Sequence, residues 1–310
     1  MFTTIRHMIH RYTHGSVTWI DVTNPAPNEV HDLIKETGLP IVLATDLTAM
    51  TPRTETHVEK KALKITLDFP IVKRTDINHP HEIKFLATKK HLLTIRFEDI
   101  EAVDHFAKDF ETLTLSKHKK GPQSGGQLML ALLHHLYLAL DGKLDYLETK
   151  MSDIEEGIFS EREREMVSEI SNVSRRLINF RHILGTHESA LETLVREIET
   201  AFGKGTQGKA AEIVSQYVHL KRRVASLTVT TDDLRETNNS LLTTKQNETM
   251  KIFTILAFIT FPLTLFTSLF GMNTIATPIV GQTGDFWIIL GTMVVVSISF
   301  FAYFRYKKWM

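Results

Sequence analysis

The stretch MKIFTILAFITFPLTLFTSLFGMN, residues 250–273, decides the fold of this chain. After Lys251 it carries no charge, and it ends on the tripeptide Gly-Met-Asn. Its uncharged part, residues 252–270, is 19 residues long, and roughly 20 apolar residues are needed to cross ~30 Å of membrane hydrocarbon as a helix. A core helix of a soluble protein normally keeps a polar face, which this run lacks. We therefore expect a transmembrane helix that carries threonines through its middle.

A second uncharged run, FWIILGTMVVVSISFFAYF, follows at residues 286–304. Lys245 and Lys251 precede the first run, and basic residues follow the second, whereas residues 271–285 contain neither lysine nor arginine. Because cytoplasmic flanks carry the excess of basic residues, this distribution predicts that both termini are cytoplasmic and that the short loop lies outside. The sequence thus predicts a multi-pass protein of the cell membrane.

Upstream of these runs, residues 1–120 alternate between strand and helix patterns. Residues 16–22 (SVTWIDV) and the apolar run 39–45 (LPIVLAT) predict strands, and residues 82–97 predict a hairpin around Lys89 and Lys90. Residues 28–38 have helical apolar spacing and end on glycine. We expect an α/β domain that ends at the breaker-rich stretch GPQSGG, residues 121–126.

Residues 121–250 are expected to form a stalk of long helices. The last helix begins near Ala210 and meets no helix breaker before Pro262, so a continuation to Phe270 gives ~60 residues and ~90 Å. Apolar residues recur along it every seven positions, which indicates a packing stripe on neighbouring helices. This stripe consists of Ile213, Leu220, Leu227, Leu234 and Leu241.

The composition excludes several classes of function. Lys plus Arg and Asp plus Glu both number 36, so the chain lacks the basic excess of a nucleic-acid-binding protein. No cysteine is present, which excludes disulfides and thiolate metal sites. No phosphate-binding loop, nucleophile elbow or metalloprotease motif occurs. We therefore expect neither an enzyme nor transport driven by nucleotide hydrolysis.

One face of the first predicted span is mildly polar. Steps of three and four residues, counted back from Gly271, select one side of the helix. The positions selected are Ser268, Thr264, Phe261, Ala257, Thr254, Met250 and Asn247. Hydroxyl groups on such a stripe suit either contact between helices or the lining of a water-filled pore. The spacing alone leaves both interpretations open.

Continuing the same count toward the N-terminus favours a pore. It reaches Thr243, Ser240, Glu236, Asp233 and Val229, so the stripe becomes polar and acidic where the helix leaves the membrane. A packing interface would stay apolar there, whereas a cation pathway would become acidic. Because one span cannot enclose a pore, several copies must surround an axis.

The residues now quoted resemble the CorA family of divalent-cation channels. The resemblance rests on FPLTLFTSLFGMN, on NETMK just upstream, on the second span with its basic C-terminus and on WIDVTNP near the N-terminus. It implies a funnel-shaped homopentamer that carries Mg²⁺, and also Co²⁺ or Ni²⁺, down the electrochemical gradient. Its partners would be these cations, further copies of the chain and membrane lipids, with no organic cofactor and no nucleic acid.

The same resemblance implies roles along the pore. Asn273 would supply an outer ring of amide oxygens and Gly271 backbone carbonyls, so that Gly271, Met272 and Asn273 form the selectivity filter, with Met272 packing between helices. Thr264 would form a polar ring within the pore and Asn247 a polar ring at the inner mouth. The hydrophobic constriction would consist of Met250 and Phe253. Glu212 would be one half of a regulatory Mg²⁺ site between subunits, although such a residue is also typical of a solvated helix face.

Two departures from the family pattern bear on ion choice. Phe270 stands where the family usually has tyrosine, and the outer loop has TPIV, residues 277–280, in place of a stretch containing glutamate. Asp285 is the only acidic residue of the loop. Two alternatives stay open: a Zn²⁺ transporter of the same architecture, and a membrane-anchored coiled-coil scaffold that conducts nothing.

The fold class expected is an α+β membrane protein with six segments. They are an α/β domain (1–120), a helical stalk (121–250), a pore-lining span (251–271), an external loop (272–285), a second span (286–304) and a basic tail (305–310).

Overall fold

The computed structural model describes residues 8–51, 54–70, 81–115, 121–272, 279–281 and 283–307. The chain divides into two compact units, Met1–Arg235 and Glu236–Met310. One helix, α5 (Thr206–Phe270), contributes residues to both units.

The first unit is built on a six-stranded sheet. Its strands are β1 (Met8–His14), β2 (Val17–Thr23), β3 (Glu55–Glu59), β4 (Ala62–Phe69), β5 (His81–Ala87) and β6 (His91–Arg96). They lie in the order β1-β2-β6-β5-β4-β3, and only the β2–β6 pair is parallel. The expected strand in WIDV is β2, and the expected hairpin around Lys89 and Lys90 joins β5 to β6.

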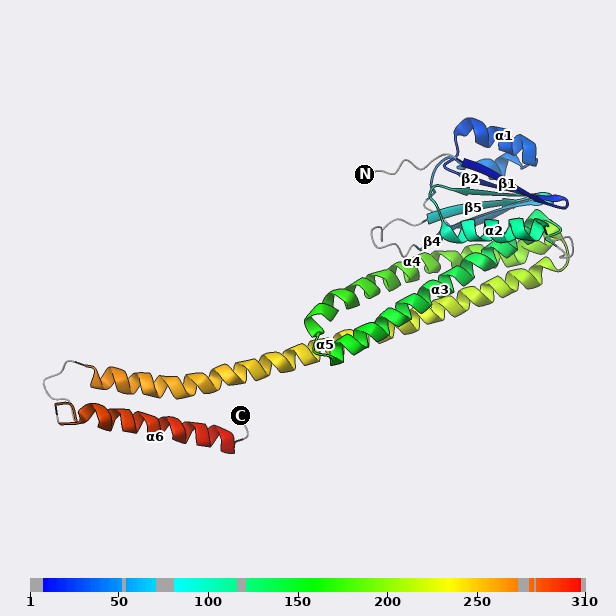
Figure 1. Ribbon diagram of the computed structural model, residues 1–310. Coiled ribbons are helices and arrows are strands. Elements are labelled where there is room, and N and C mark those ends of the chain that lie inside the picture. The colour runs from blue at the N-terminus through cyan, green and yellow to red at the C-terminus, as the bar shows by residue number, and fades with distance from the viewer. Residues whose placement is uncertain are drawn as a thin grey trace. The chain divides into compact units, whose positions relative to one another are not determined.

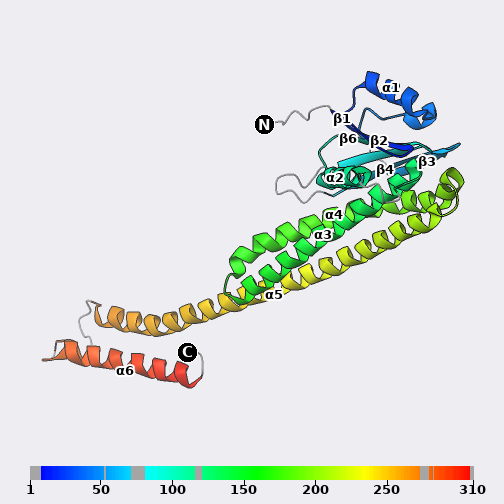
Figure 2. The same ribbon diagram turned by 45° about the vertical axis from the view of Figure 1, so that its right-hand side comes forward.

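Helices cover both faces of this sheet (Figures 1 and 2). On one face lies α1 (Pro27–Thr37), which begins at a proline and ends at Gly38 with φ of 66°, a conformation that glycine adopts without strain. On the other face lie α2 (Glu101–Leu115), α3 (Gly125–Phe159) and α4 (Glu163–Phe202). Covering on both faces explains why β4, β5 and β6 are almost entirely buried.

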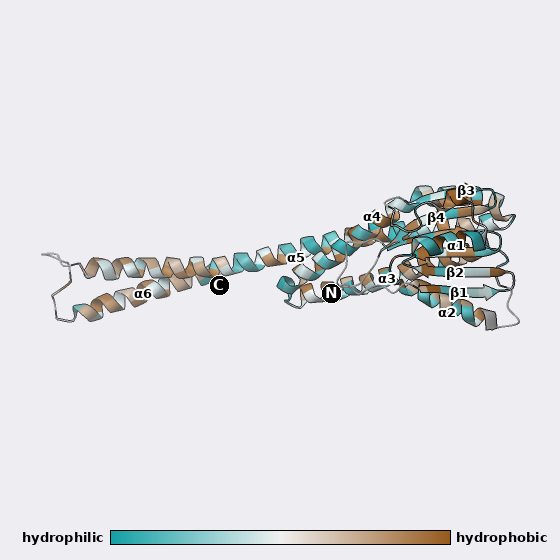
Figure 3. Ribbon diagram, turned by 90° about the horizontal axis from the view of Figure 1, so that it is seen from above, coloured by the Kyte–Doolittle hydropathy of each residue, from teal (hydrophilic) through white to brown (hydrophobic). Residues whose placement is uncertain are grey.

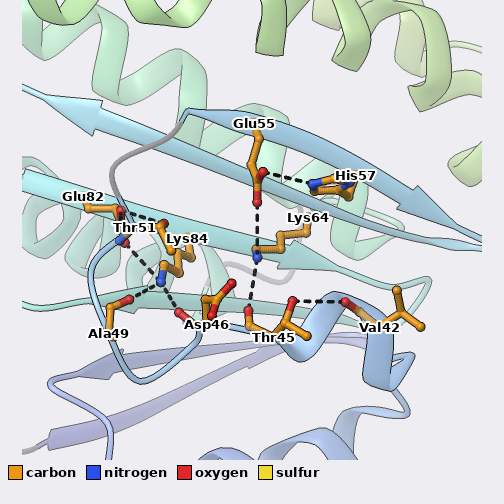
Figure 4. A network of polar contacts seen from close by, with 10 residues as sticks. All are labelled: Val42, Thr45, Asp46, Ala49, Thr51, Glu55, His57, Lys64, Glu82 and Lys84. Atoms are coloured by element: carbon orange, nitrogen blue, oxygen red, sulfur yellow. Dashed lines mark hydrogen bonds and ion pairs between the residues drawn. The ribbon is translucent and has the colours of Figure 1, made fainter.

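One predicted strand is wrong. The apolar run LPIVLAT contains a short 3₁₀ helix, η1 (Ile41–Ala44), instead of a buried strand. Within η1 only Leu43 enters the core, with Leu33 and Leu47, whereas Ile41 and Val42 are 75 % and 66 % exposed. The following loop is held down by two lysines that rise from the sheet (Figure 4). Lys64 Nζ donates to Thr45 O at 3.2 Å, and Lys84 Nζ donates to Asp46 O and Ala49 O.

The WIDV segment anchors a buried polar chain between β2, β6 and α2. The Trp19 indole donates to Thr94 Oγ1 at 2.9 Å, and Thr94 donates to Asp21 at 2.5 Å. Asp21 Oδ2 also accepts from Arg96 Nε and Nη2, at 3.1 and 3.0 Å, and Arg96 Nη2 reaches Asp104 at 2.7 Å. A buried charge is tolerated only when it is paired and hydrogen-bonded. These side-chain contacts therefore fix the strand register and the start of α2.

The three long helices α3, α4 and α5 lie side by side in the first unit (Figure 1). On α5, Ile213, Leu220 and Leu227 of the predicted heptad stripe are buried, while Leu234 and Leu241 are half-buried. Arg223 of α5 binds Asp141, Asp145 and Glu148, which occupy one face of α3. This cluster was not predicted from the sequence: the acids have the spacing i, i+4 and i+7 that places them on one helix face, but nothing local indicates their basic partner on another helix.

His187 joins the helices to the sheet. It is fully buried on α4, where its Nδ1 accepts from the Tyr137 hydroxyl and its Nε2 donates to Asp68 O, both at 2.7 Å. Burial lowers the pKa of His187 to about 4. Burial and the nearby Glu82, opposed by His182, raise the pKa of Asp68 to about 6. For each group the folded and unfolded pKa values differ, and both intervals lie roughly between pH 4 and 6.5. In that pH range the protonation of each group therefore depends on whether the protein is folded.

Their contributions to stability run in opposite directions. The lowered pKa of His187 means that its contribution to folding stability is lost as pH falls from about 6.5 to about 4. The raised pKa of Asp68 means that its contribution to folding stability is lost as pH rises from about 4 to about 6.

We expect Asp68→Asn to raise the free energy of unfolding by about 1–3 kcal/mol at pH 7.5, because a partly buried charge is removed. Below pH 6 its thermal stability should then fall more steeply with acid than that of the wild type. Thermal unfolding followed by circular dichroism from pH 4.5 to 8 measures both effects, and equal pH slopes would contradict the assignment.

Candidate functional site

The second unit contains two helices long and apolar enough to cross a membrane. They are the C-terminal part of α5 and all of α6 (Asp285–Tyr306). Hydrophobic residues dominate both (Figure 3), yet only 6 % and 0 % of their most apolar windows are buried. A core helix would be mostly covered by protein, so this exposed apolar surface suits lipid.

Within this unit, α6 packs along one side of α5. Ile255 and Phe304 are buried, at 6 % and 5 % exposed, and the rings of Phe258 and Phe304 lie 6.2 Å apart. Ile259, Phe266 and Phe270 are half-buried. At about 100° per residue the buried Ile255 and these three half-buried positions fall within about 60° of one another around the helix. They define the face of α5 that the second span covers.

The polar stripe lies on the opposite side of α5. With the same rotation per residue, the positions from Met250 to Gly271 centre about 180° from the face that α6 covers. Each stripe residue is exposed except Ala257, which is half-buried. Those exposed are Asn247, Met250, Thr254, Phe261, Thr264, Ser268 and Gly271. The second span of the same chain therefore leaves the stripe open.

The continuation of the stripe toward the N-terminus of α5 is open as well. Val229 is 61 % exposed, and Asp233, Glu236, Ser240 and Thr243 are exposed. On the opposite flank of α5, Thr231 and Asn238 are buried. Phe253, expected at the constriction with Met250, is 60 % exposed, and Met250 is 57 % exposed. These apolar side chains at the N-terminal end of the span are left uncovered by the second span.

The stripe's threonines present oxygen lone pairs. Thr254 donates its hydroxyl proton to Met250 O at 2.8 Å, and Thr264 donates to Thr260 O at 2.9 Å. Because each proton is used within the helix, the outward side of each oxygen is an acceptor. Thr260 and Thr267, off the stripe, make similar bonds, so the bond itself is a general feature of this helix. What distinguishes Thr254 and Thr264 is their position on the open face.

The C-terminal end of α5 is closely packed at glycine. Gly271 N donates to Thr267 O at 2.9 Å, and a Cβ at Gly271 would lie 2.8 Å from that same oxygen. Any side chain here would therefore displace the end of the helix. Met272 is exposed, and its N–H donates to Leu269 O at 3.4 Å. Asn273 lies outside the described residues.

Two acidic residues considered from the sequence differ in their surroundings. The Asp285 carboxylate accepts hydrogen bonds from Gly281 N at 2.9 Å and from its neighbour Phe286 N at 2.7 Å, so it holds the start of α6. Glu212 lies exposed on α5 in the first unit. Among the described ranges, no group of three or more His, Asp or Glu side chains is arranged to hold a metal ion. The regulatory role of Glu212 stays a prediction.

Together these features define a class of protein: a two-span membrane protein with an α/β domain, long helices and an open polar stripe on its first span. The chain matches the family model described as CorA-like Mg2+ transporter protein over residues 14–308. The chain belongs to this family, whose members transport divalent cations across membranes.

Similar proteins cover most of the chain. The cobalt/magnesium transport protein CorA of Methanocaldococcus jannaschii is 23 % identical over 94 % of this chain and 90 % of its own length. The cobalt/magnesium transport protein CorA of Thermotoga maritima is 25 % identical, over 54 % of this chain and 48 % of its own length. The magnesium transport protein CorA of Wolinella succinogenes is 22 % identical over 96 % of this chain and 92 % of its own.

Solved structures share the fold. The complete structure of the CorA magnesium transporter from M. jannaschii matches with a TM-score of 0.80 at 21 % identity, covering 95 % of this chain and 92 % of the other. The ZntB cytoplasmic domain from Vibrio parahaemolyticus matches with a TM-score of 0.59 at 12 % identity, covering 76 % and 97 %. The expected α/β domain, long helices and two membrane-spanning candidates are thus confirmed.

Proposed function

We propose that the chain is a passive divalent-cation channel that conducts chiefly Mg²⁺, and also Co²⁺ or Ni²⁺. Identical subunits, five by the family resemblance, would bring the polar stripe of α5 together around a central axis, with α6 on the lipid side. The observation that carries this proposal is the position of the stripe about 180° from the face that α6 covers. Both termini would be cytoplasmic, because the basic residues flank the spans on that side.

An ion that passes through the proposed channel would keep much of its water shell. Mg²⁺ gives up water reluctantly, so neutral oxygens that accept hydrogen bonds from its bound water suit it better than a tight cage of carboxylates. In this proposal Asn273 and the Gly271 carbonyl select the hydrated ion, and Thr264, Thr254 and Asn247 provide acceptor oxygens along the path. Met250 and Phe253 form the constriction that closes by excluding water. Asp233 and Glu236 raise the local cation concentration at the inner mouth.

Replacing Thr264 by valine tests the pore lining with little change in shape. Valine removes the outward-facing oxygen, and one lost hydrogen bond to bound water, worth about 1 kcal/mol, corresponds to about fivefold in rate. We expect Mg²⁺ uptake into proteoliposomes, followed with a fluorescent indicator, to fall about fivefold or more, because each copy in the ring loses its acceptor.

Thr267→Val is the matched control, since Thr267 makes the same type of backbone bond away from the stripe. Its uptake should stay within about twofold of wild type, as expected for a hydroxyl that makes no contact with the ion. Equal loss in both variants would count against a pore on this face. Parallel uptake of Zn²⁺, with and without a pH gradient, distinguishes the Zn²⁺ alternative, and absence of any flux indicates a scaffold.

A further inference from the structure

A basic pocket lies at one edge of the sheet in the first unit, where two hairpin turns meet. Leu63 of β4 faces Ala87 of β5, so the turn that precedes β4 and the turn that follows β5 lie at the same edge. The first turn carries Lys60 and Lys61, and the second carries Lys89 and Lys90. The topology therefore gathers two pairs of lysines that are about 30 positions apart in the sequence.

The pocket has a volume of about 360 Å³. The four lysines, His91 and Thr88 line it, together with Ala62, Thr37 at the end of α1, Gly38 and Pro40. Among the residues that the structure describes, no acidic side chain lines it. All four lysines are exposed, and within the described ranges their ammonium groups form no ion pair. By contrast, Lys64 and Lys84, on the neighbouring strands, are both paired with glutamates.

The backbone adds further donors. In the second turn Thr88 N donates to His91 O, and the carbonyls of Lys89 and Lys90 accept from Gly125 and Thr18, so the turn is held in place. The N–H groups of Lys89 and Lys90 make no backbone hydrogen bond within the part of the chain that the structure describes. The negative end of the α1 dipole, near Gly38, opposes an anion, but it amounts to about half a charge against four ammonium groups.

Four like charges around one pocket repel one another, and a bound polyanion relieves that repulsion. A single phosphate carries at most about two negative charges near neutral pH, so it would leave the cluster half-compensated. A chain of three phosphates matches the cluster, and a volume of about 360 Å³ falls within the range of small-molecule sites, about 300–1,000 Å³. Pro40 and the lysine stems offer apolar surface to a base or sugar.

We propose that this pocket binds a nucleoside triphosphate through its phosphate chain, and that it prefers the nucleotide free of Mg²⁺. The preference follows from charge: Mg²⁺ on the phosphates cancels two of the negative charges that the lysines attract. The site is separate from the polar stripe of α5, and its occupancy is measured without reference to ion flux.

The test uses the full-length protein in detergent micelles, freed of divalent cations with a chelator, and a fluorescently labelled ATP followed by anisotropy. The site variant is Lys61→Glu/Lys90→Glu, with one change in each turn. It avoids Lys60, because its φ of 55° lies in the left-handed region and a substitution there would also change the backbone strain. The matched control is Lys108→Glu/Arg164→Glu, which changes net charge equally at two exposed positions on α2 and α4. Circular dichroism and the unfolding temperature establish that both variants are folded.

We expect the site variant to bind labelled ATP at least about tenfold more weakly and the control to bind within about twofold of wild type. Inorganic tripolyphosphate should displace the labelled ATP, whereas adenosine should not. Excess Mg²⁺ should weaken binding to the wild type. The proposal is overturned if wild type does not bind, if both variants lose binding equally, if adenosine competes as well as tripolyphosphate, or if Mg²⁺ strengthens binding.

Discussion

Mg²⁺ uptake into proteoliposomes containing Asn273→Ala is expected to fall by at least about tenfold relative to wild type. In the proposed channel this residue supplies the amide oxygens that meet the hydrated ion first, and alanine leaves that ring without an acceptor. A tenfold loss corresponds to about 1.4 kcal/mol, which is close to one or two lost hydrogen bonds per ion. Because every subunit of the ring loses its amide oxygen, the tenfold loss is a lower bound. Because Asn273 lies outside the described residues, this prediction rests on the sequence and on the position of Gly271.

The control for this experiment is Asn172→Ala. Asn172 lies on α4, where its amide oxygen accepts only an exposed hydrogen bond from Arg175 at 2.7 Å. Protein incorporation is matched by quantifying the reconstituted chain, and uptake is measured over a range of external Mg²⁺. Undiminished flux through Asn273→Ala would contradict the proposed role of Asn273 in the filter. The pore lining along α5 would then be tested by the Thr264 variant.

The second large effect is expected on stability, at the buried chain that links Asp21, Arg96 and Asp104. Arg96→Met should lower the free energy of unfolding by about 3–5 kcal/mol, because it leaves the Asp21 carboxylate buried without its cation. Arg96 is 4 % exposed and Asp21 3 % exposed, so water cannot replace the lost partner without opening the sheet. Denaturant unfolding of the full chain in detergent, followed by the fluorescence of Trp19 and the other tryptophans, measures the loss.

Two further variants separate the charge from general effects of substitution. Asp21→Asn/Arg96→Met removes both charges and should recover part of the loss, since no unpaired charge stays buried. Arg11→Met breaks an exposed pair with Glu36 and should cost no more than about 1 kcal/mol. Equal losses in Arg96→Met and Arg11→Met would show that the buried Arg96–Asp21 pair contributes no more to stability than the exposed Arg11–Glu36 pair.

The membrane spans and the long helices could be predicted from the sequence because their signals are local. An uncharged run of 19 residues has few alternatives, and the absence of a breaker between Ala210 and Pro262 extends the helix without reference to anything else. Pro262 itself does not end α5. The stripe was equally predictable, because helical rotation alone places its members on one side.

Other features depend on contacts between distant segments. The run Ile41–Ala44 resembles a strand by composition, yet only Leu43 is buried, and nothing local shows which residue meets the core. WIDV could be read from the sequence as a strand and as a family motif, but the partners of Trp19 and Asp21 lie more than 70 positions away, at Thr94 and Arg96. The side of α5 that α6 covers likewise required the structure, since two apolar runs can pack in many registers.

Cysteine scanning of α5 tests the central claim most directly, because the wild-type chain contains no cysteine and needs no prior substitution. Single cysteines would be placed from Thr254 to Ser268 in the reconstituted protein and treated with a charged, membrane-impermeant thiol reagent. The proposed channel predicts that modification at 254, 257, 261, 264 and 268 alters ion flux, whereas modification at 255, 259 and 266 does not. Reactivity spread evenly around the helix, or confined to positions 255, 259 and 266, would contradict a water-filled path along the polar stripe.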